Sequence, residues 1–327
     1  MIKISFIVIG YNIENYIERC IKSISNQTIR DIEIIFVDDG STDNTVNIVK
    51  RIAENDDRIR IICQENQGAN AARKTGFSNS NGEYIIFVDG DDWIDLNTGK
   101  ELYEIVNNYN YEIVCYNYIR TYDDEKKNKK FTAKMYDNIK DYEYLELLLK
   151  QQIPHELWNK IYKRDLLMNA KFNEVCKTSM GEDLAANILI ATLKPKVKMI
   201  DKHYYYYYQR SNSTMNTITE RLLQIVDSLN YIEDILKKKG LYNKYKKELD
   251  YLWFDQCYYY NIIKNSVKCN KYHKELFKLW KNKNICIKEN ILCNAVINRS
   301  KKIKIINFMY SINYYLGSIS GKILLSE

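Results

Sequence analysis

Strand-like and helix-like patterns alternate along the first 120 residues of this chain. Runs of β-branched and aromatic residues indicate strands, and apolar residues three and four positions apart indicate helices. We expect strands at 3–10, 31–38, 58–63, 83–88 and 111–119, with helices at 16–24, 46–52, 69–77 and 96–106. This order predicts an α/β fold in which a mostly parallel sheet is flanked by helices on both faces.

Two acidic clusters follow two of the expected strands. Asp38 and Asp39 end the second strand, and Asp89, Asp91 and Asp92 follow the fourth. Ligands bind at the carboxyl ends of the strands in such sheets, so both clusters fall on the expected binding edge. Carboxylates one residue apart suit a hard cation such as Mg²⁺ or Mn²⁺, and a fixed carboxylate can accept an N–H from a nucleotide base. Each cluster alone is explained equally well as a polar turn or a helix cap.

The composition excludes a disordered chain and an integral membrane protein. Hydrophobic residues make up 46% and charged residues 28% of the 327 positions, and no apolar run approaches the ~18 residues that span a bilayer. The eight cysteines are scattered without a Cys-x-x-Cys pair, and a strand-like run begins where a signal peptide would stand. We therefore expect a cytoplasmic protein with reduced thiols.

Four segments stand in a fixed order in the first 120 residues. They are 6–12 (FIVIGYN), 38–43 (DDGSTD), 66–76 (NQGANAARKTG) and 84–93 (YIIFVDGDDW). In this order and at these separations they resemble the inverting glycosyltransferases of family 2. One such motif occurs often by chance, whereas four in order are specific. The resemblance implies a GT-A fold, which is a Rossmann-like sheet flanked by helices.

The resemblance also implies how the nucleotide is held. Asp39 would bind the base, most often uracil. Tyr11 and Asn12 would line the nucleotide, and Arg73 would hold the nucleotide or its phosphates. Lys74 stands where many relatives have Asn, so the role of position 74 is left open.

The second acidic cluster would serve the donor sugar and the metal. By resemblance, Asp89 with the neighbouring Gly90 contacts the donor sugar or ribose. Asp91 ligates Mn²⁺ or Mg²⁺, with Asp89 as a second ligand. A cation there would neutralise charge that develops on a diphosphate leaving group.

The block at 141–210 resembles bacterial enzymes that build surface polysaccharides. Its Gly181-Glu182-Asp183 segment is similar to the family's base-bearing motif. Inverting transfer needs a base that takes the proton of the acceptor hydroxyl, and Asp183 is our candidate, with Glu182 second. The alternative is that these carboxylates offset the dipole of a helix that begins there.

Five further residues are candidates for contacts with the acceptor or the phosphates: Asp92, Trp93, His155, Trp158 and Arg210. Aromatic rings can stack on a sugar face, and His and Arg can meet a diphosphate. Packing in the core explains the two tryptophans at least as well, and a lone histidine is more often an ordinary polar residue.

The C-terminal part is predicted to be helical and basic. The segment from Lys264 to Lys304 contains twelve Lys and Arg residues but only two acidic residues. Apolar residues that approximate one helical face follow, as in a helix lying in a membrane interface; they are Ile303, Ile306, Met309, Ile312, Tyr315 and Leu316. Core packing or oligomerisation explains the same pattern. We expect a GT-A domain at 1–215, with a nucleotide-binding half at 1–120 and an acceptor-side half at 121–215, and a helical basic region at 216–327.

The sequence thus predicts a metal-dependent inverting enzyme that transfers a hexose or N-acetylhexosamine from a UDP-sugar to a glycan or lipid-linked acceptor. We expect it to act in capsular or exopolysaccharide synthesis, on the inner face of the cell membrane, with no nucleic-acid partner. A protein-linked glycan is the alternative acceptor. A nucleotidyltransferase or a dinucleotide-dependent dehydrogenase is disfavoured, because neither glycine-rich motif follows the first strand. A non-catalytic scaffold for anionic surfaces leaves the ordered acidic motifs unexplained.

Overall fold

The computed structural model describes residues 1–134, 136, 139, 143–210 and 219–325 and divides into two compact units. The first unit comprises Met1–Leu148, Ile153–Lys177 and Ala186–Ser213. The second comprises Leu149–Gln152, Thr178–Ala185 and Thr214–Glu327. The predicted domain boundary at residue 215 lies in 211–218, outside the described residues, so the predicted domain limits stay a prediction.

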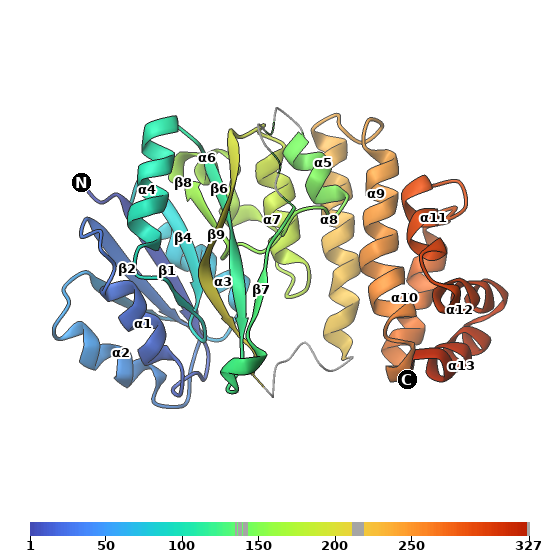
Figure 1. Ribbon diagram of the computed structural model, residues 1–327, viewed down its shortest axis with the longest axis horizontal. Coiled ribbons are helices and arrows are strands. Elements are labelled where there is room, and N and C mark those ends of the chain that lie inside the picture. Colours follow the sequence, from blue (N-terminus) through green and yellow to red (C-terminus); the bar gives the residue numbers. More distant parts are fainter. Residues whose placement is uncertain (135, 137–138, 140–142, 211–218, 326–327) are drawn as a thin grey trace. The chain divides into compact units, whose positions relative to one another are not determined.

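The first unit is built on one sheet (Figure 1). In the described residues its strand order is β3-β2-β1-β4-β8-β6-β9-β5, and β7 pairs with β6. The strands are β1 (Ile4–Gly10), β2 (Ile32–Asp38), β3 (Ile59–Cys63), β4 (Tyr84–Asp89), β5 (Trp93–Ile94), β6 (Ile113–Thr121), β7 (Lys129–Phe131), β8 (Lys160–Lys163) and β9 (Val197–Tyr208). The helices as far as residue 191 are α1 (Ile17–Ser25), α2 (Thr45–Ala53), α3 (Ala69–Ser78), α4 (Thr98–Tyr109), α5 (Glu143–Leu149), α6 (Arg164–Asn169) and α7 (Glu182–Ala191), with single turns η1 (Glu125–Lys127) and η2 (Phe172–Glu174).

The sheet is parallel in its first four strands and mixed beyond them. β1 pairs in parallel with β2 and β4, and β2 pairs in parallel with β3, as the β-α-β order predicts. The short strand β8 then runs antiparallel between β4 and β6. A four-residue strand has too few alternating positions to be recognised from sequence, so the predicted fifth strand, β6, is one place further from β4 than its order suggests.

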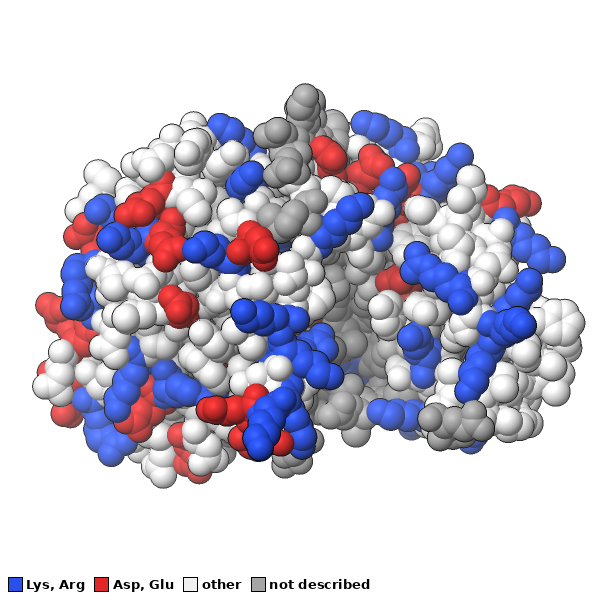
Figure 2. All heavy atoms as spheres, in the orientation of Figure 1, with Lys and Arg blue, Asp and Glu red and all other residues white. Residues whose placement is uncertain are grey.

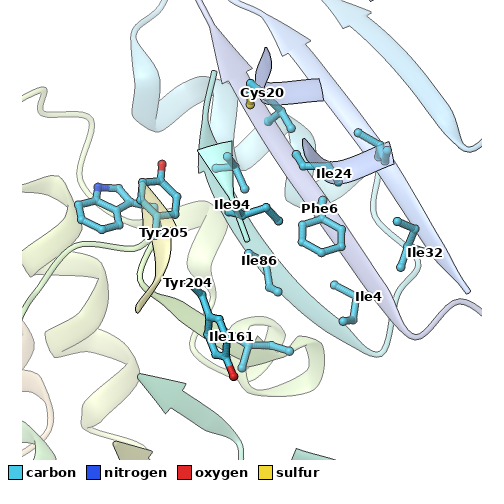
Figure 3. Packing of buried hydrophobic residues seen from close by; sticks show 14 of the residues in the cluster. Ile4, Phe6, Cys20, Ile24, Ile32, Ile86, Ile94, Ile161, Tyr204 and Tyr205 are labelled. Carbon is cyan, nitrogen blue, oxygen red and sulfur yellow. The ribbon is translucent and has the colours of Figure 1, made fainter. Parts of the chain in front are cut away.

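Both faces of the parallel part are covered, which is why its strands are apolar on both sides. On one face Phe6 packs with Cys20 and Ile24 of α1 (Figure 3). On the other face, α3 approaches so closely that a Cβ atom at Gly76 would lie 2.3 Å from Cγ2 of Ile7. The strand ends are therefore fixed by packing from two sides.

The second unit is helical in its described residues, as the sequence predicts for this part of the chain. Its helices are α8 (Gln224–Lys238), α9 (Lys246–Trp253), the π-helix η5 (Phe254–Ile263), α10 (Lys271–Asn282), α11 (Ile291–Asn298), α12 (Lys301–Ile312) and α13 (Tyr314–Leu325), with single turns η4 (Glu220–Leu223) and η6 (Ser266–Lys268). Among the helices that the structure describes, none has the length and apolar character to cross a bilayer.

Candidate active site

The two acidic clusters lie on either side of the carboxyl end of β1. Gly10 at the end of β1 is paired in register with Asp38 of β2. One residue earlier, Ile9 is paired with Asp89 of β4. The sheet therefore brings both clusters to its carboxyl edge, as the predicted topology requires.

At the β2 end, the carboxylate of Asp39 organises a loop. It is 4% exposed. One of its oxygens accepts hydrogen bonds from Nε2 of Gln64 at 2.7 Å and from the main-chain N–H of Gln67 at 2.9 Å, and the other accepts from Gly68 N–H at 2.7 Å. Gly68 has a φ of +88°, which favours glycine, and α3 begins at the next residue. Asp39 thus fixes the segment that leads into α3, and its contact with a base stays a prediction.

Asn12 joins the loop after β1 to the loop after β2. Its main-chain N–H donates to Oγ of Ser41 at 2.9 Å, and its side-chain oxygen accepts from Thr42 N–H at 2.8 Å. Tyr11, the residue before it, is 48% exposed. The two loops are thus held together, with the Tyr11 side chain exposed beside them, and the predicted contact of Tyr11 and Asn12 with the nucleotide stays a prediction.

At the β4 end, each carboxylate of the Asp89-x-Asp91 motif forms an ion pair with an arginine. Nη2 of Arg73 lies 2.9 Å from Oδ1 of Asp89, and Nη2 of Arg210 lies 2.5 Å from Oδ2 of Asp91. Burial raises the pKa of Asp91, Arg210 opposes this rise, and the negative charge of Asp89 adds to it. Arg73 and Arg210 come from distant parts of the chain, and the structure brings both of them to the motif.

Between these carboxylates, Gly90 is required by packing. A Cβ atom at position 90 would lie 2.4 Å from Cδ1 of Ile13 and 2.8 Å from the carbonyl oxygen of Ile9. No larger residue fits without a shift of β1. The structure thus explains the glycine without a ligand, and its predicted place beside the donor sugar stays a prediction.

Asp89 and Asp91 suit a hard divalent cation in their chemistry, since both offer carboxylate oxygens. Within the described ranges, no group of three or more His, Cys, Asp or Glu side chains is gathered as a metal site. Proteins nonetheless usually supply only one or two carboxylate ligands where substrate phosphates supply further ligands to the cation. The residues therefore fit a cation that binds together with a diphosphate.

Asp92 differs from its neighbours because it is fully buried. Its two oxygens accept hydrogen bonds from the hydroxyl of Tyr205 and from the N–H of Tyr208, both at 2.7 Å. Burial, and after it the charges of Asp91 and Asp89, raises the pKa of Asp92 well above its ordinary value. Asp92 anchors β9 to the motif, and this position gives no support to the predicted contact with an acceptor or a phosphate.

The two tryptophans proposed as sugar platforms are covered by other side chains. Tyr206 stacks on Trp93 with ring centroids 5.2 Å apart, and the Arg19 guanidinium carbon lies 3.6 Å from the centre of the Trp93 ring. Trp158 is buried against Tyr205, at a centroid distance of 4.3 Å. Trp158 is packed in the core, the alternative considered for it, whereas Trp93 is half-buried between Tyr206 and Arg19. The sugar contacts of both residues stay a prediction.

Sequence reasoning missed Arg19 and left Lys74 open. Arg19 donates to the carbonyl oxygen of Asp91 at 3.2 Å, and no motif marks it. Lys74 donates to the carbonyl oxygen of Val175 at 2.6 Å, and Asn70 of the same helix donates to that of Cys176. Position 74 therefore fastens α3 to a later loop.

The remaining candidates lie away from the strand ends in sequence. His155 is half-buried, and its carbonyl oxygen accepts from Asn187 at 2.8 Å. Glu182 and Asp183 form the first turn of α7, after Gly181 with its φ of +77°. They belong to the second unit, and the role of Asp183 as the base, like that of Glu182 as its substitute, stays a prediction.

Comparison with known proteins identifies the family of this chain. The model of the family described as Glycosyl transferase family 2 matches residues 5–170. The chain is 36% identical over 247 residues to glycosyltransferase GlyA of Streptococcus pneumoniae. This match covers 73% of the chain and 35% of GlyA. It is 30% identical over 272 residues to the cholesterol galactosyltransferase of Borreliella burgdorferi, covering 79% of this chain and 74% of that protein. The chain thus spans about a third of GlyA and about three quarters of the second relative.

Solved structures show the same fold. S. aureus TarS 1–349 in complex with UDP-GlcNAc has a TM-score of 0.72 at 18% identity and covers 99% of this chain and 90% of its own. The mannosyltransferase PcManGT from Pyrobaculum calidifontis, in complex with GDP-Man and Mn²⁺, has a TM-score of 0.53 at 13% identity and covers 98% of this chain and 87% of its own. The family match, the GT-A fold and the acidic strand ends agree, and the chain belongs to glycosyl transferase family 2.

Proposed function

We propose that this enzyme transfers a hexose or N-acetylhexosamine from a UDP-sugar to a hydroxyl group, with inversion at the anomeric carbon. The observation that carries the proposal is the pair of strand ends at one sheet edge, with a loop-organising carboxylate on one side and two arginine-paired carboxylates on the other. The complex of TarS with UDP-GlcNAc supports a uridine nucleotide as donor.

The residues at the β4 end would handle the diphosphate. Arg73 is buried and fixed on Asp89, so it offers a positive charge at low entropic cost. Arg210 is about a third exposed and can turn from Asp91 to a phosphate oxygen. Mn²⁺ or Mg²⁺ held by Asp91 and Asp89 would supply Lewis-acid stabilisation of the leaving group; the complex of PcManGT with Mn²⁺ supports this assignment.

Asp183, with Glu182 second, would take the proton from the acceptor hydroxyl as that oxygen attacks the anomeric carbon. The bond between the sugar and the diphosphate breaks in the same step, and UDP leaves with the electron pair. We propose a glycan or lipid-linked saccharide as acceptor, in the synthesis of a bacterial surface polysaccharide. We also propose that the enzyme works in the cytoplasm, on the inner face of the cell membrane.

A donor panel tests this proposal. UDP release is measured with UDP-glucose, UDP-galactose, their N-acetyl forms, GDP-mannose and dTDP-glucose, with and without Mn²⁺. We expect release from one UDP-sugar with Mn²⁺ present, and an inverted product anomer by NMR. Asp183→Asn should lower turnover roughly a hundredfold, the usual size of a lost general base. The exposed Asp57 gives the matched control Asp57→Asn, which should be unchanged. Release from GDP-mannose alone, or a fully active Asp183→Asn variant, overturns the corresponding assignment.

A further inference from the structure

The last helix, α13, packs with its small residues inward. Gly317, Ser318 and Gly321 are the residues of this helix that are buried. A Cβ atom at Gly317 would lie 2.2 Å from the ring of Tyr310, and one at Gly321 would lie 2.0 Å from Cβ of Ser266. Small residues let the backbone of α13 approach its neighbours closely, and the larger apolar side chains are left on the other side.

Those larger side chains are exposed. Ile319 and Ile323, four positions apart on α13, are 55% and 65% exposed, and Leu316 continues the same stripe. On α12, Ile305, Phe308 and Ile312 are spaced by three and four positions, and Phe308 is 59% exposed. Two helices of a folded unit thus each present an apolar stripe outward, whereas such stripes ordinarily face a core.

The exposed stripe is not the helical face predicted from sequence. Asn313 has an extended conformation, with φ −160° and ψ 166°, and separates α12 from α13. Ile303 and Ile306, assigned to the predicted face, are buried inside the second unit, and only Ile312, Tyr315 and Leu316 of that set are exposed. The prediction of a single continuous helix face is therefore wrong. The structure has two shorter apolar stripes, one on α12 and one on α13.

The charged residues of the segment that carries these stripes have one sign. Residues 290–326 contain Arg299, Lys301, Lys302, Lys304 and Lys322 and no Asp or Glu. The four lysines and Arg299 are exposed. Figure 2 shows uncharged and basic side chains over the region where α12 and α13 lie in Figure 1. Apolar residues framed by cations match a bilayer surface that carries anionic headgroups.

We propose that the outward faces of α12 and α13 bind an anionic lipid bilayer and lie in its interface. The stripes enter the boundary between headgroups and acyl chains, and the lysines contact anionic headgroups. A second copy of the chain fits less well, because a symmetric contact would bring the same cations against each other. This proposal deepens the membrane location in the proposed function, and lipid binding is measured apart from sugar transfer, so that either can fail alone.

Vesicle sedimentation tests the proposal with the full chain. We expect binding to vesicles in which a third of the phosphatidylcholine is replaced by phosphatidylglycerol, and much weaker binding to phosphatidylcholine alone. Phe308→Ser combined with Ile319→Ser should weaken binding at least about tenfold, since each removes a buried apolar side chain from the bound state. Lys301→Gln combined with Lys302→Gln should reduce the dependence on anionic lipid.

The matched control is Leu96→Ser combined with Tyr109→Ser, two apolar residues of the first unit that are 49% and 61% exposed. This control should bind vesicles as the wild type does. Circular dichroism and UDP binding should be unchanged in all variants, because the substituted side chains are exposed. Absence of binding to anionic vesicles, or equal loss in the control, overturns the proposal. A wild-type dimer in sedimentation velocity that the Phe308/Ile319 variant loses, without vesicle binding, would identify the second copy as the occupant.

Discussion

The ends of β2 and β4 carry similar acidic sequences but use their carboxylates differently. At the β2 end, Asp39 accepts three hydrogen bonds from the 64–68 loop, two of them from main-chain N–H groups. At the β4 end, Asp89 and Asp91 face the guanidinium groups of Arg73 and Arg210. The first carboxylate holds the local backbone in place, and the other two are paired with arginine side chains.

This difference separates stability from activity. Main-chain hydrogen bonds to a buried carboxylate are part of the fold, and their loss leaves buried donors unsatisfied. Ion pairs that are partly exposed contribute little to stability. Substitution of Asp39 at the β2 end should therefore cost both stability and binding, whereas substitution of Asp91 or Arg210, whose ion pair is partly exposed, should cost activity alone.

The largest expected effect is that of Asp91→Asn on turnover. This substitution removes one of the two carboxylates assigned to the cation, and stabilisation of the leaving group by several kcal/mol corresponds to roughly a thousandfold in rate. Steady-state kinetics with the donor found in the panel measures this loss. The free energy of unfolding should stay close to that of the wild type. Turnover within a few-fold of the wild type contradicts the role of Asp91.

The next effect is that of Asp39→Asn on stability. The amide presents an NH₂ group where the carboxylate accepted N–H groups, so at least one buried donor loses its partner, at a cost of about 2–3 kcal/mol. Urea unfolding measures the change, with Asp57→Asn as the control. UDP affinity should fall about tenfold as the loop loosens, which equals about 1.4 kcal/mol. A variant as stable as the wild type would show that Asp39 does not hold the loop.

Arg210→Gln should have a smaller effect, and on activity only. The Arg210–Asp91 pair is partly exposed, so its loss should change stability by less than about 1 kcal/mol. The value of kcat/KM should fall several-fold, because a charge near the diphosphate is lost. Arg30→Gln, at an exposed arginine of the same unit, is the matched control. If Arg210→Gln lowers the temperature of thermal unfolding and leaves kcat/KM unchanged, Arg210 is structural.

The smallest effect is expected for Asp92→Asn, and it concerns how the free energy of unfolding changes with pH. The folded state raises the pKa of Asp92 above its unfolded value, so it favours the protonated form. The stability that the protonated Asp92 side chain contributes to the wild type is fully present below the unfolded pKa and is lost as the pH rises through the folded pKa. The stability of Asp92→Asn relative to the wild type should therefore improve steadily from pH 4 to pH 9 in urea titrations. A difference that does not change with pH would mean that Asp92 is ionised in the fold.

The strand ends could be predicted from sequence because each strand is a short local pattern, and parallel order places their carboxyl ends together. The partners of the carboxylates could not. Tyr205 lies 113 positions from Asp92, and Arg210 reaches Asp91 only through the register of β9. The exposure of Phe308 was hidden for another reason, since periodicity marks an apolar stripe without showing which side of a helix is covered. The break at Asn313 carries no proline or glycine that would mark it.

Calorimetric titration with UDP, with and without Mn²⁺, tests the central claim that a nucleotide sugar binds across these two strand ends. The wild type should bind UDP, and more tightly with Mn²⁺. Asp91→Asn should bind UDP but lose the gain from Mn²⁺, and Asp39→Asn should bind weakly in both conditions. UDP binding that neither substitution changes, or no UDP binding by the wild type, would contradict the account.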